Sequence, residues 1–217
     1  MSDQERYVPA AGRRVLTRLY DPVLALTTRE RRFRALLLDQ VLRDLPAEAT
    51  VVDVGCGTGT FAIALAGARP DLCVIGIDGD TDILALAERK PGARAVTWRH
   101  GLAGRLPAED TSAHTIVMSL LLHHLDPDGK RQALAETVRV LRPGGHLQIA
   151  DWGRPHDLLM RGAFLLLQTL DGFENTRDHA AGRLPGLVQD AGLQDVTTYA
   201  RLRTAWGSLD LIGATRR

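Results

Sequence analysis

The chain has 217 residues and a formal net charge of +1, with 27 basic and 26 acidic side chains. This near balance gives no electrostatic case for a nucleic acid or an anionic membrane as a partner. Hydrophobic residues make up 45% and charged residues 24%, which is typical of one globular domain with its own core. The two cysteines, Cys56 and Cys73, lack metal-ligand spacing and indicate a reducing compartment.

The sequence shows no targeting or membrane-spanning segment. Its first residues, MSDQERYVPAAGRR, are polar and charged and do not resemble a signal peptide. The longest apolar stretches, such as AFLLLQTL, are too short to cross a bilayer. We therefore expect a cytoplasmic protein, whose oligomeric state the sequence does not define.

The N-terminal part is predicted to be helical over residues 8–45. Thr28 can cap a helix whose apolar positions recur at helical spacing, and Pro46 ends that helix. A β-branched strand over 50–55 then enters a glycine turn, and a helix over 60–68 follows it.

Strands and helices alternate in the middle of the chain. Further strands are predicted at 72–78, 94–99, 114–120 and 146–152. Between them, Asp80 caps a helix over 81–90, and Asp126 with Pro127 begins one that runs to Leu141 and ends at Pro143-Gly144-Gly145. Helices that separate successive strands imply a parallel, doubly wound sheet.

The C-terminal part departs from this alternation. Helices are predicted at 156–171 and 184–191, followed by strands at 195–202 and 208–217. The link between the last two strands is too short for a crossover helix, so they should be antiparallel. The predicted fold is α/β, a Rossmann-like, mostly parallel seven-stranded sheet with an antiparallel C-terminal strand pair and helices on both faces. We expect a single domain over 1–217, with a core at 46–152 and a C-terminal part at 153–217.

The sharpest motif is Val-Val-Asp-Val-Gly-Cys-Gly-Thr-Gly at 51–59. Glycines at a strand-to-helix turn let the backbone approach a ligand closely, and the helix N-terminus offers free N–H groups. Asp78 lies 19 residues after Gly59, at the end of the next strand, where a carboxylate can accept hydrogen bonds from a ribose diol. The pattern predicts a cofactor that contains adenosine.

Two such cofactors compete. The nicotinamide fingerprint requires glycine or alanine where this chain has Thr60. Asp53, two residues before Gly55, suits the ammonium group of S-adenosylmethionine and disfavours a pyrophosphate. Asp53 therefore favours S-adenosylmethionine over NAD(P).

The ordered motifs resemble those of a known family. Residues 51–151 are similar to class I S-adenosylmethionine-dependent methyltransferases, particularly the branch of ubiquinone and menaquinone C-methyltransferases. The resemblance lies in VVDVGCGTG, in GIDGD and in RVLRPGGHLQIAD, and it extends to YDPVLALTTRERRFR upstream and DWGRP downstream. It implies that residues 1–45 form a substrate lid.

The resemblance also implies roles for single residues. The methionine side of the cofactor would lie against the turn residues Asp53, Gly55, Cys56, Gly57, Thr58 and Gly59. Asp78 would bind the ribose and Gly79 would begin the adenine wall. Leu102 and Ala103 would lie against the adenine, and Ser119 near the sulfonium. The family often has an acidic or amide residue in place of Leu102, so adenine recognition here would rely on packing and backbone contact; His114 replaces a usual Asp.

Candidates for a general base stand at the carboxyl edge of the predicted sheet. His123 and His124 follow the fourth strand and Asp151 closes the fifth. Each of them can equally be a hydrogen-bonded structural residue. The same choice holds for the aromatic residues, which either line an acceptor pocket or fill the core: Tyr20, Phe33, Trp152, Phe164 and Phe173. No metal ligand is predicted, although scattered carboxylates leave a magnesium-dependent enzyme open.

The function predicted from these residues is methyl transfer from S-adenosylmethionine to a small molecule, with S-adenosylhomocysteine as product. The apolar residues of 158–173 suggest an apolar acceptor such as a quinone, a lipid or a natural product. The alternatives are an NAD(P)-dependent oxidoreductase and a protein that binds S-adenosylmethionine without catalysis. The sequence defines neither the acceptor nor whether carbon, nitrogen or oxygen is methylated.

Overall fold

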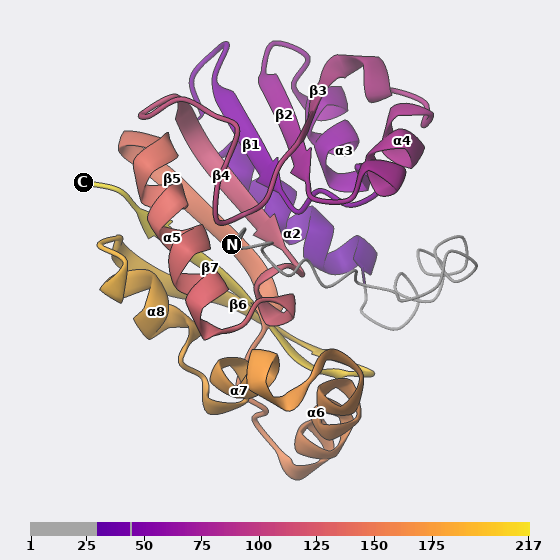
Figure 1. Ribbon diagram of the computed structural model, residues 1–217, viewed down its shortest axis with the longest axis vertical. Coiled ribbons are helices and arrows are strands. Elements are labelled where there is room, and N and C mark those ends of the chain that lie inside the picture. The colour runs from indigo at the N-terminus through magenta and orange to yellow at the C-terminus, as the bar shows by residue number, and fades with distance from the viewer. Residues whose placement is uncertain (1–29, 44) are drawn as a thin grey trace, which may run out of the picture.

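The computed structural model describes residues 30–43 and 45–217 (Figure 1). The predicted helices before residue 30, and with them most of the expected lid, lie outside the described residues. The described part of that region is α2 (Glu30–Leu42). It buries Phe33, Leu37 and Val41, which recur every fourth residue and form one face of the helix.

The chain forms one seven-stranded sheet. In chain order its strands are β1 (Thr50–Val54), β2 (Cys73–Asp78), β3 (Val96–His100), β4 (Ala113–Ser119), β5 (Leu141–Trp152), β6 (Gln194–Thr204) and β7 (Gly207–Thr215). Their spatial order is β3-β2-β1-β4-β5-β7-β6, and β7 pairs antiparallel with both of its neighbours while β1 to β5 are parallel. The predicted fold class is confirmed, with β7 as the reversed strand.

Helices cover both faces of this sheet. They are α3 (Thr60–Ala68), α4 (Thr81–Glu88), α5 (Pro127–Val140), α6 (Leu158–Asp171), α7 (Phe173–Ala181) and α8 (Leu184–Asp190), with short 3-10 turns η1 (Ala93–Ala95) and η2 (Leu122–His124). Alternate residues of β1 belong to two separate hydrophobic cores. The core that contains Val51 includes residues of α2, α3 and α6, and the core that contains Val52 includes residues of α5 and α8. Within the described ranges, no helix is long and apolar enough to cross a membrane.

One predicted boundary was wrong, and one helix was missed. The fifth strand begins at Leu141, directly after α5, because Leu141 already pairs with Ala113 of β4. Pro143-Gly144-Gly145 therefore lies in an irregular part of that strand and does not end the helix. Helix α7 was not predicted, because its buried residues are Thr176, Asp178 and His179 and show no apolar period.

A fully buried lysine ties α7 to α5. The Nζ of Lys130 donates to the backbone oxygen of Asn175 and lies 3.4 Å from Oδ2 of Asp178. Burial lowers the pKa of Lys130, and Asp178 opposes that shift. A buried ion pair of this kind is costly to break on one side only.

Replacing Lys130 by Met should lower the free energy of unfolding by about 3 kcal/mol, because Asp178 loses its buried cation and keeps only the exposed Arg183, 3.8 Å from its Oδ1. The double variant Lys130→Met/Asp178→Leu should recover a large part of this loss. Urea unfolding of both variants measures the difference, and equal losses in the two would contradict the role assigned to the pair.

Candidate active site

The glycine turn after β1 is fastened to the end of β2. Gly55, Gly57 and Gly59 adopt φ values of +69°, +53° and +72°, which glycine tolerates best. The N–H groups of Gly55 and Cys56 donate to the carbonyl oxygen of Ile77 at 2.8 and 3.0 Å. The turn is therefore held in place by backbone hydrogen bonds, independently of its side chains.

Trp98 of β3 fills the space beneath this turn. A Cβ on Gly59 would lie 2.3 Å from the ring of Trp98, and one on Gly76 would lie 2.6 Å from it. By contrast, a Cβ on Gly57 would meet nothing within 4 Å. Gly59 and Gly76 thus admit the indole ring, whereas Gly57 leaves an open approach to the backbone from the ligand side.

Asp78 stands beside the turn, at the end of β2. Its Oδ2 accepts a hydrogen bond from the N–H of Gly57 at 2.8 Å, and its Oδ1 accepts one from the N–H of Asp80 at 3.0 Å. Each carboxylate oxygen retains a further lone pair for a hydroxyl group. Burial raises the pKa of Asp78, and the hydrogen bonds from Asp80 and Gly57 oppose this rise.

The predicted adenine wall forms next to Asp78. The N–H of Gly101 donates to the carbonyl oxygen of Asp78 at 3.0 Å, and the ring of His100 lies 3.1 Å from the oxygen of Gly79. These contacts bring the half-buried residues Leu102 and Ala103 to the same end of the sheet. The structure thus brings together the residues predicted for the ribose and adenine.

Asp53 lies behind the turn, nearly inaccessible to solvent at 1% exposure. Its Oδ1 has no hydrogen-bond partner within the described part of the chain, and burial raises its pKa to about 7. Arg34 of α2 lowers that pKa, and its own Nε is also buried without a partner there. The sequence analysis missed Arg34, because nothing distinguishes it from the other scattered arginines.

Two turn residues are less exposed to a ligand than predicted from the motif alone. The hydroxyl of Thr58 accepts a hydrogen bond from Nζ of Lys90 at 2.7 Å, which directs it towards the end of α4. Cys56 is buried, and burial raises the pKa of its thiol, so it stays protonated. It serves here as a small residue between two glycines.

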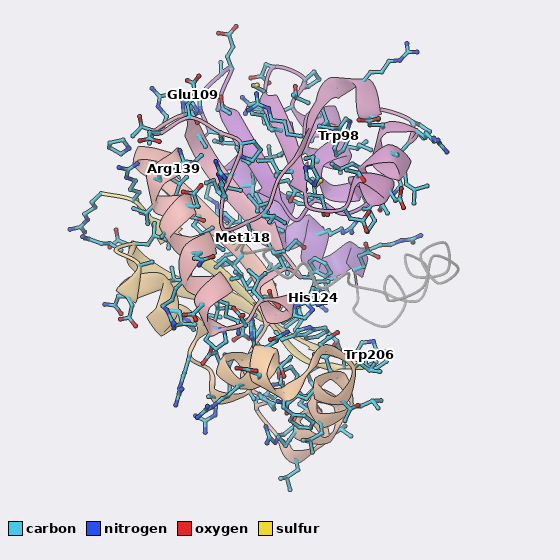
Figure 2. The ribbon with its side chains drawn as sticks, in the orientation of Figure 1. Trp98, Glu109, Met118, His124, Arg139 and Trp206 are labelled. Carbon is cyan, nitrogen blue, oxygen red and sulfur yellow. The ribbon has the colours of Figure 1, made fainter. Side chains whose placement is uncertain are left out.

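The predicted acceptor side lies where β4 and β5 end. After Ser119, Leu120 adopts a left-handed φ of +52° and donates to the carbonyl oxygen of Ala150 at 2.8 Å. This bend sends the chain into η2, which carries His123 and His124. Figure 2 shows His124 at that end of the strands, facing the helices α6 and α7.

Asp151 organises this end of the sheet from a position without solvent exposure. Its Oδ2 accepts from the N–H of Leu122 at 2.8 Å, and its Oδ1 accepts from the N–H of Trp152 at 2.7 Å. The Nδ1 of His123 also lies 2.7 Å from Oδ1. Although burial alone would raise the pKa of Asp151, His123 and His179 hold it well below its usual range, so the carboxylate is ionised. An ionised carboxylate only accepts, so Nδ1 of His123 donates to Oδ1, and Nε2 points away from Asp151.

Helices α6 and α7 bring further polar groups to η2. Asp171, the last residue of α6, places its carboxylate 3.8 Å from Nε2 of His123 and 3.9 Å from Nδ1 of His124. Asn175 of α7 donates through Nδ2 to the carbonyl oxygen of His124 at 3.0 Å. Asp171 reaches the histidines through the path of α6, and no local pattern around Asp171 predicts that contact.

Most of the candidate pocket aromatics belong to the core. Phe33, Trp152 and Phe164 are at most 3% exposed, whereas Phe173 is 57% exposed, and Tyr20 lies outside the described residues. Exposed apolar side chains also occur along α6: Leu158, Leu159, Leu165, Leu166 and Leu170. These leucines give α6 an exposed apolar surface.

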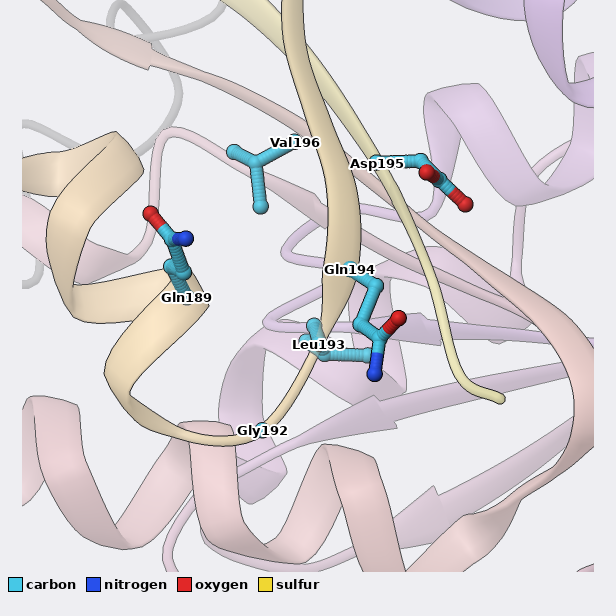
Figure 3. A pocket seen from close by; sticks show the side chains of 6 residues that line it. All are labelled: Gln189, Gly192, Leu193, Gln194, Asp195 and Val196. Atoms are coloured by element: carbon cyan, nitrogen blue, oxygen red, sulfur yellow. The ribbon is translucent and has the colours of Figure 1, made fainter.

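Two hollows lie elsewhere. One of about 450 Å³ is formed by α8 and the start of β6 (Figure 3), at the edge of the sheet opposite to the glycine turn. It is lined by Gln189, Gly192, Leu193, Gln194, Asp195 and Val196. Another, of about 490 Å³, lies behind the end of β5, between residues 152–156 and the ion pair of Arg201 with Asp210. Since ligands of such sheets bind at the carboxyl ends of the strands, the first hollow is not the cofactor site.

A seven-stranded sheet with β7 reversed, a glycine turn after β1 and a carboxylate at the end of β2 define the class I methyltransferase fold. Residues 51–145 match the model of a methyltransferase domain family. A demethylmenaquinone methyltransferase of Deinococcus radiodurans is 35% identical over 118 residues, which cover 54% of this chain and 48% of the relative.

Solved structures show the same fold. A SAM-dependent methyltransferase of Methanosarcina mazei has a TM-score of 0.63 at 24% identity, over 79% of this chain and 94% of that one. Phosphoethanolamine N-methyltransferase 2 of Haemonchus contortus, in complex with S-adenosyl-L-methionine, has a TM-score of 0.66 at 15% identity, over 85% of this chain and 52% of that one.

The fold and the matched domain are those of class I S-adenosylmethionine-dependent methyltransferases, and the relatives that the chain resembles include demethylmenaquinone methyltransferases. It spans about half the length, or less, of the first curated relatives that it matches.

The position of the Trp98 ring predicts that alanine will cost more stability at Gly59 than at Gly57. Gly57→Ala should cost about 1–2 kcal/mol of stability, the usual strain of a left-handed alanine. Gly59→Ala should cost about 1–3 kcal/mol more, because its methyl group overlaps the ring of Trp98. Chemical unfolding compares the two variants, and equal costs would show that the ring gives way freely.

Proposed function

We propose that this protein transfers the methyl group of S-adenosylmethionine to a small-molecule acceptor and releases S-adenosylhomocysteine. The observation that carries the proposal is the pairing of Asp78 with the open glycine turn, in which the carboxylate holds the N–H of Gly57 at 2.8 Å. When bound, the cofactor supplies an electrophilic methyl group. The chain contributes binding, orientation and the exclusion of water.

The buried charges behind the turn support this cofactor. Its methionine part carries both an ammonium and a carboxylate group. Oδ1 of Asp53 and Nε of Arg34 are buried without a partner among the residues described, although another nitrogen of Arg34 pairs with Glu30 and its side chain is 27% exposed. Buried polar atoms normally have a partner. We assign Asp53 to the ammonium and Arg34 to the carboxylate. A dinucleotide would instead bring its pyrophosphate towards Asp53, which disfavours an NAD(P)-dependent oxidoreductase.

The acceptor is proposed to lie at the ends of β4 and β5, beyond Ser119. His123 directs Nε2 to this side because Asp151 holds Nδ1, so His123 can accept a proton from an acceptor hydroxyl or carbon. In this assignment Asp151 positions the imidazole, and His124 lines the site. The exposed leucines of α6 and the quinone named in several relatives support an apolar, quinone-like acceptor.

Cofactor binding tests the proposal. Calorimetric titration should show that S-adenosylmethionine and S-adenosylhomocysteine bind, and that Asp78→Ala weakens both by tenfold or more because the ribose acceptor and the support of Gly57 are lost. Glu88→Ala, an exposed carboxylate on α4, is the matched control and should bind normally.

Binding of NADH in place of both S-adenosyl ligands would overturn the proposal. Tight binding of S-adenosylmethionine without transfer of its labelled methyl group to quinols, phenols or amines would favour a protein that binds the cofactor without catalysis.

Asp53 gives a prediction for pH. Its pKa in the free protein is raised to about 7 by burial, with Asp78 raising it further and Arg34 lowering it. An ammonium partner favours the ionised form, so the complex has a lower pKa and binding releases a proton below pH 7. Affinity for S-adenosylhomocysteine should therefore fall as the pH drops below 7, by up to about 30-fold at pH 5.5.

Calorimetry in two buffers of different ionisation enthalpy measures both the affinity and the released proton. Asp53→Asn should bind more weakly at pH 7 and show a flat profile between pH 5.5 and 7. A wild-type profile that is equally flat would contradict the assignment of Asp53 to the ammonium group.

A further inference from the structure

Three potential metal ligands converge at the acceptor end of the sheet. One ligand atom each from His123, His124 and Asp171 lies within 4.8 Å of the other two. The carboxylate of Asp171 stands 3.8 Å from Nε2 of His123 and 3.9 Å from Nδ1 of His124. Two ligands of one ion at bonds of about 2.0–2.2 Å lie roughly 3–3.5 Å apart, so a small movement would close the site.

The surroundings of His123 are those of a metal-binding imidazole. Such a histidine normally donates its second ring N–H to a carboxylate, which fixes the tautomer and aims the free nitrogen. Asp151 makes this contact at 2.7 Å, and is itself held by the N–H groups of Leu122 and Trp152. The free nitrogen of His123 is thereby directed at Asp171.

A second, independent feature is the imidazole of His179 on α7. It has no solvent exposure, and neither ring nitrogen has a hydrogen-bond partner in the described ranges. Its Nε2 lies 3.7 Å from Oδ1 of Asp151, and its ring stands 6.2 Å from that of His123. Three imidazoles and two carboxylates thus gather at this end of the sheet.

We propose that His123, His124 and Asp171 bind a divalent transition-metal ion of the zinc class, with Asp151 as the positioning residue behind His123. Two imidazoles and one carboxylate suit zinc and its neighbours in the first transition row better than magnesium or calcium, which prefer oxygen ligands. Three protein ligands leave a coordination position open for an acceptor oxygen.

The consequence for catalysis rests on the proposed function. An ion at this site would bind a hydroxyl oxygen of the acceptor, lower its pKa and hold it in line with the methyl group. With the ion bound, Nε2 of His123 would be a ligand and would no longer accept the proton, so the hydroxyl proton would leave to solvent. No oxidant or reductant is needed. This assignment favours an acceptor with a hydroxyl or enol oxygen over an amine.

Cobalt binding tests the site without any turnover. Protein without a histidine tag is stripped with EDTA and titrated with Co²⁺ and Zn²⁺, with visible absorption and calorimetry as readouts. We expect one ion per chain, visible d–d bands from Co²⁺, and displacement of Co²⁺ by Zn²⁺. His123→Ala and Asp171→Asn should each weaken binding by at least tenfold, and Asp151→Asn by about 10–100-fold.

His146→Gln is the matched control, because His146 lies at the opposite end of β5, and it should bind the ions as wild type does. Titration of each variant with S-adenosylhomocysteine reports whether it is folded. If wild type binds S-adenosylhomocysteine but no metal, or if Asp171→Asn and His146→Gln bind metal equally, the metal site is wrong. Metal binding without S-adenosylhomocysteine binding would instead refute the proposed cofactor and leave the site standing.

Discussion

The carboxylate of Asp151 is the constraint on which the acceptor end of this molecule depends. It is shielded from solvent, yet it holds the backbone of Leu122, the backbone of Trp152 and the ring of His123. One side chain thereby joins the turn after β4 to the end of β5. An ionised group in such a place is stable only while these donors surround it, so the turn, the strand end and the histidine are fixed together.

The two ends of the candidate site are built from different kinds of groups. At the cofactor end, backbone N–H groups and glycines shape the turn, and Asp78 closes it with one hydrogen bond. At the acceptor end, the candidate site is formed by side chains from η2, β5, α6 and α7. The cofactor end depends on a short stretch of chain, whereas the acceptor end depends on the path of four elements. This difference is what we expect of a fold whose members share a cofactor and differ in their acceptors.

The sequence predicted what depends on neighbouring residues. The glycine turn, the cap at Asp80 and the start of α5 at Asp126 follow from local hydrogen bonding, and the structure contains each of them. Helix α7 and the cluster around Asp171 could not be predicted, because buried polar residues carry no periodic apolar signal. His114 could not be interpreted either, because its Nδ1 accepts a hydrogen bond from the N–H of Thr50 at 3.0 Å, a contact that depends on the pairing of β1 with β4.

The reversed strand β7 bears on how the molecule assembles. Only two residues separate β6 from β7, so this hairpin can form within microseconds, whereas the parallel pairs of the sheet need crossover connections. The segment that carries α6 and α7 lies between β5 and this hairpin, and it becomes a closed loop when β7 docks on β5. The loop that holds α6 and α7 is therefore closed by the pairing of β7 with β5, whereas the glycine turn is held by β2 and has no contact of this kind with the hairpin.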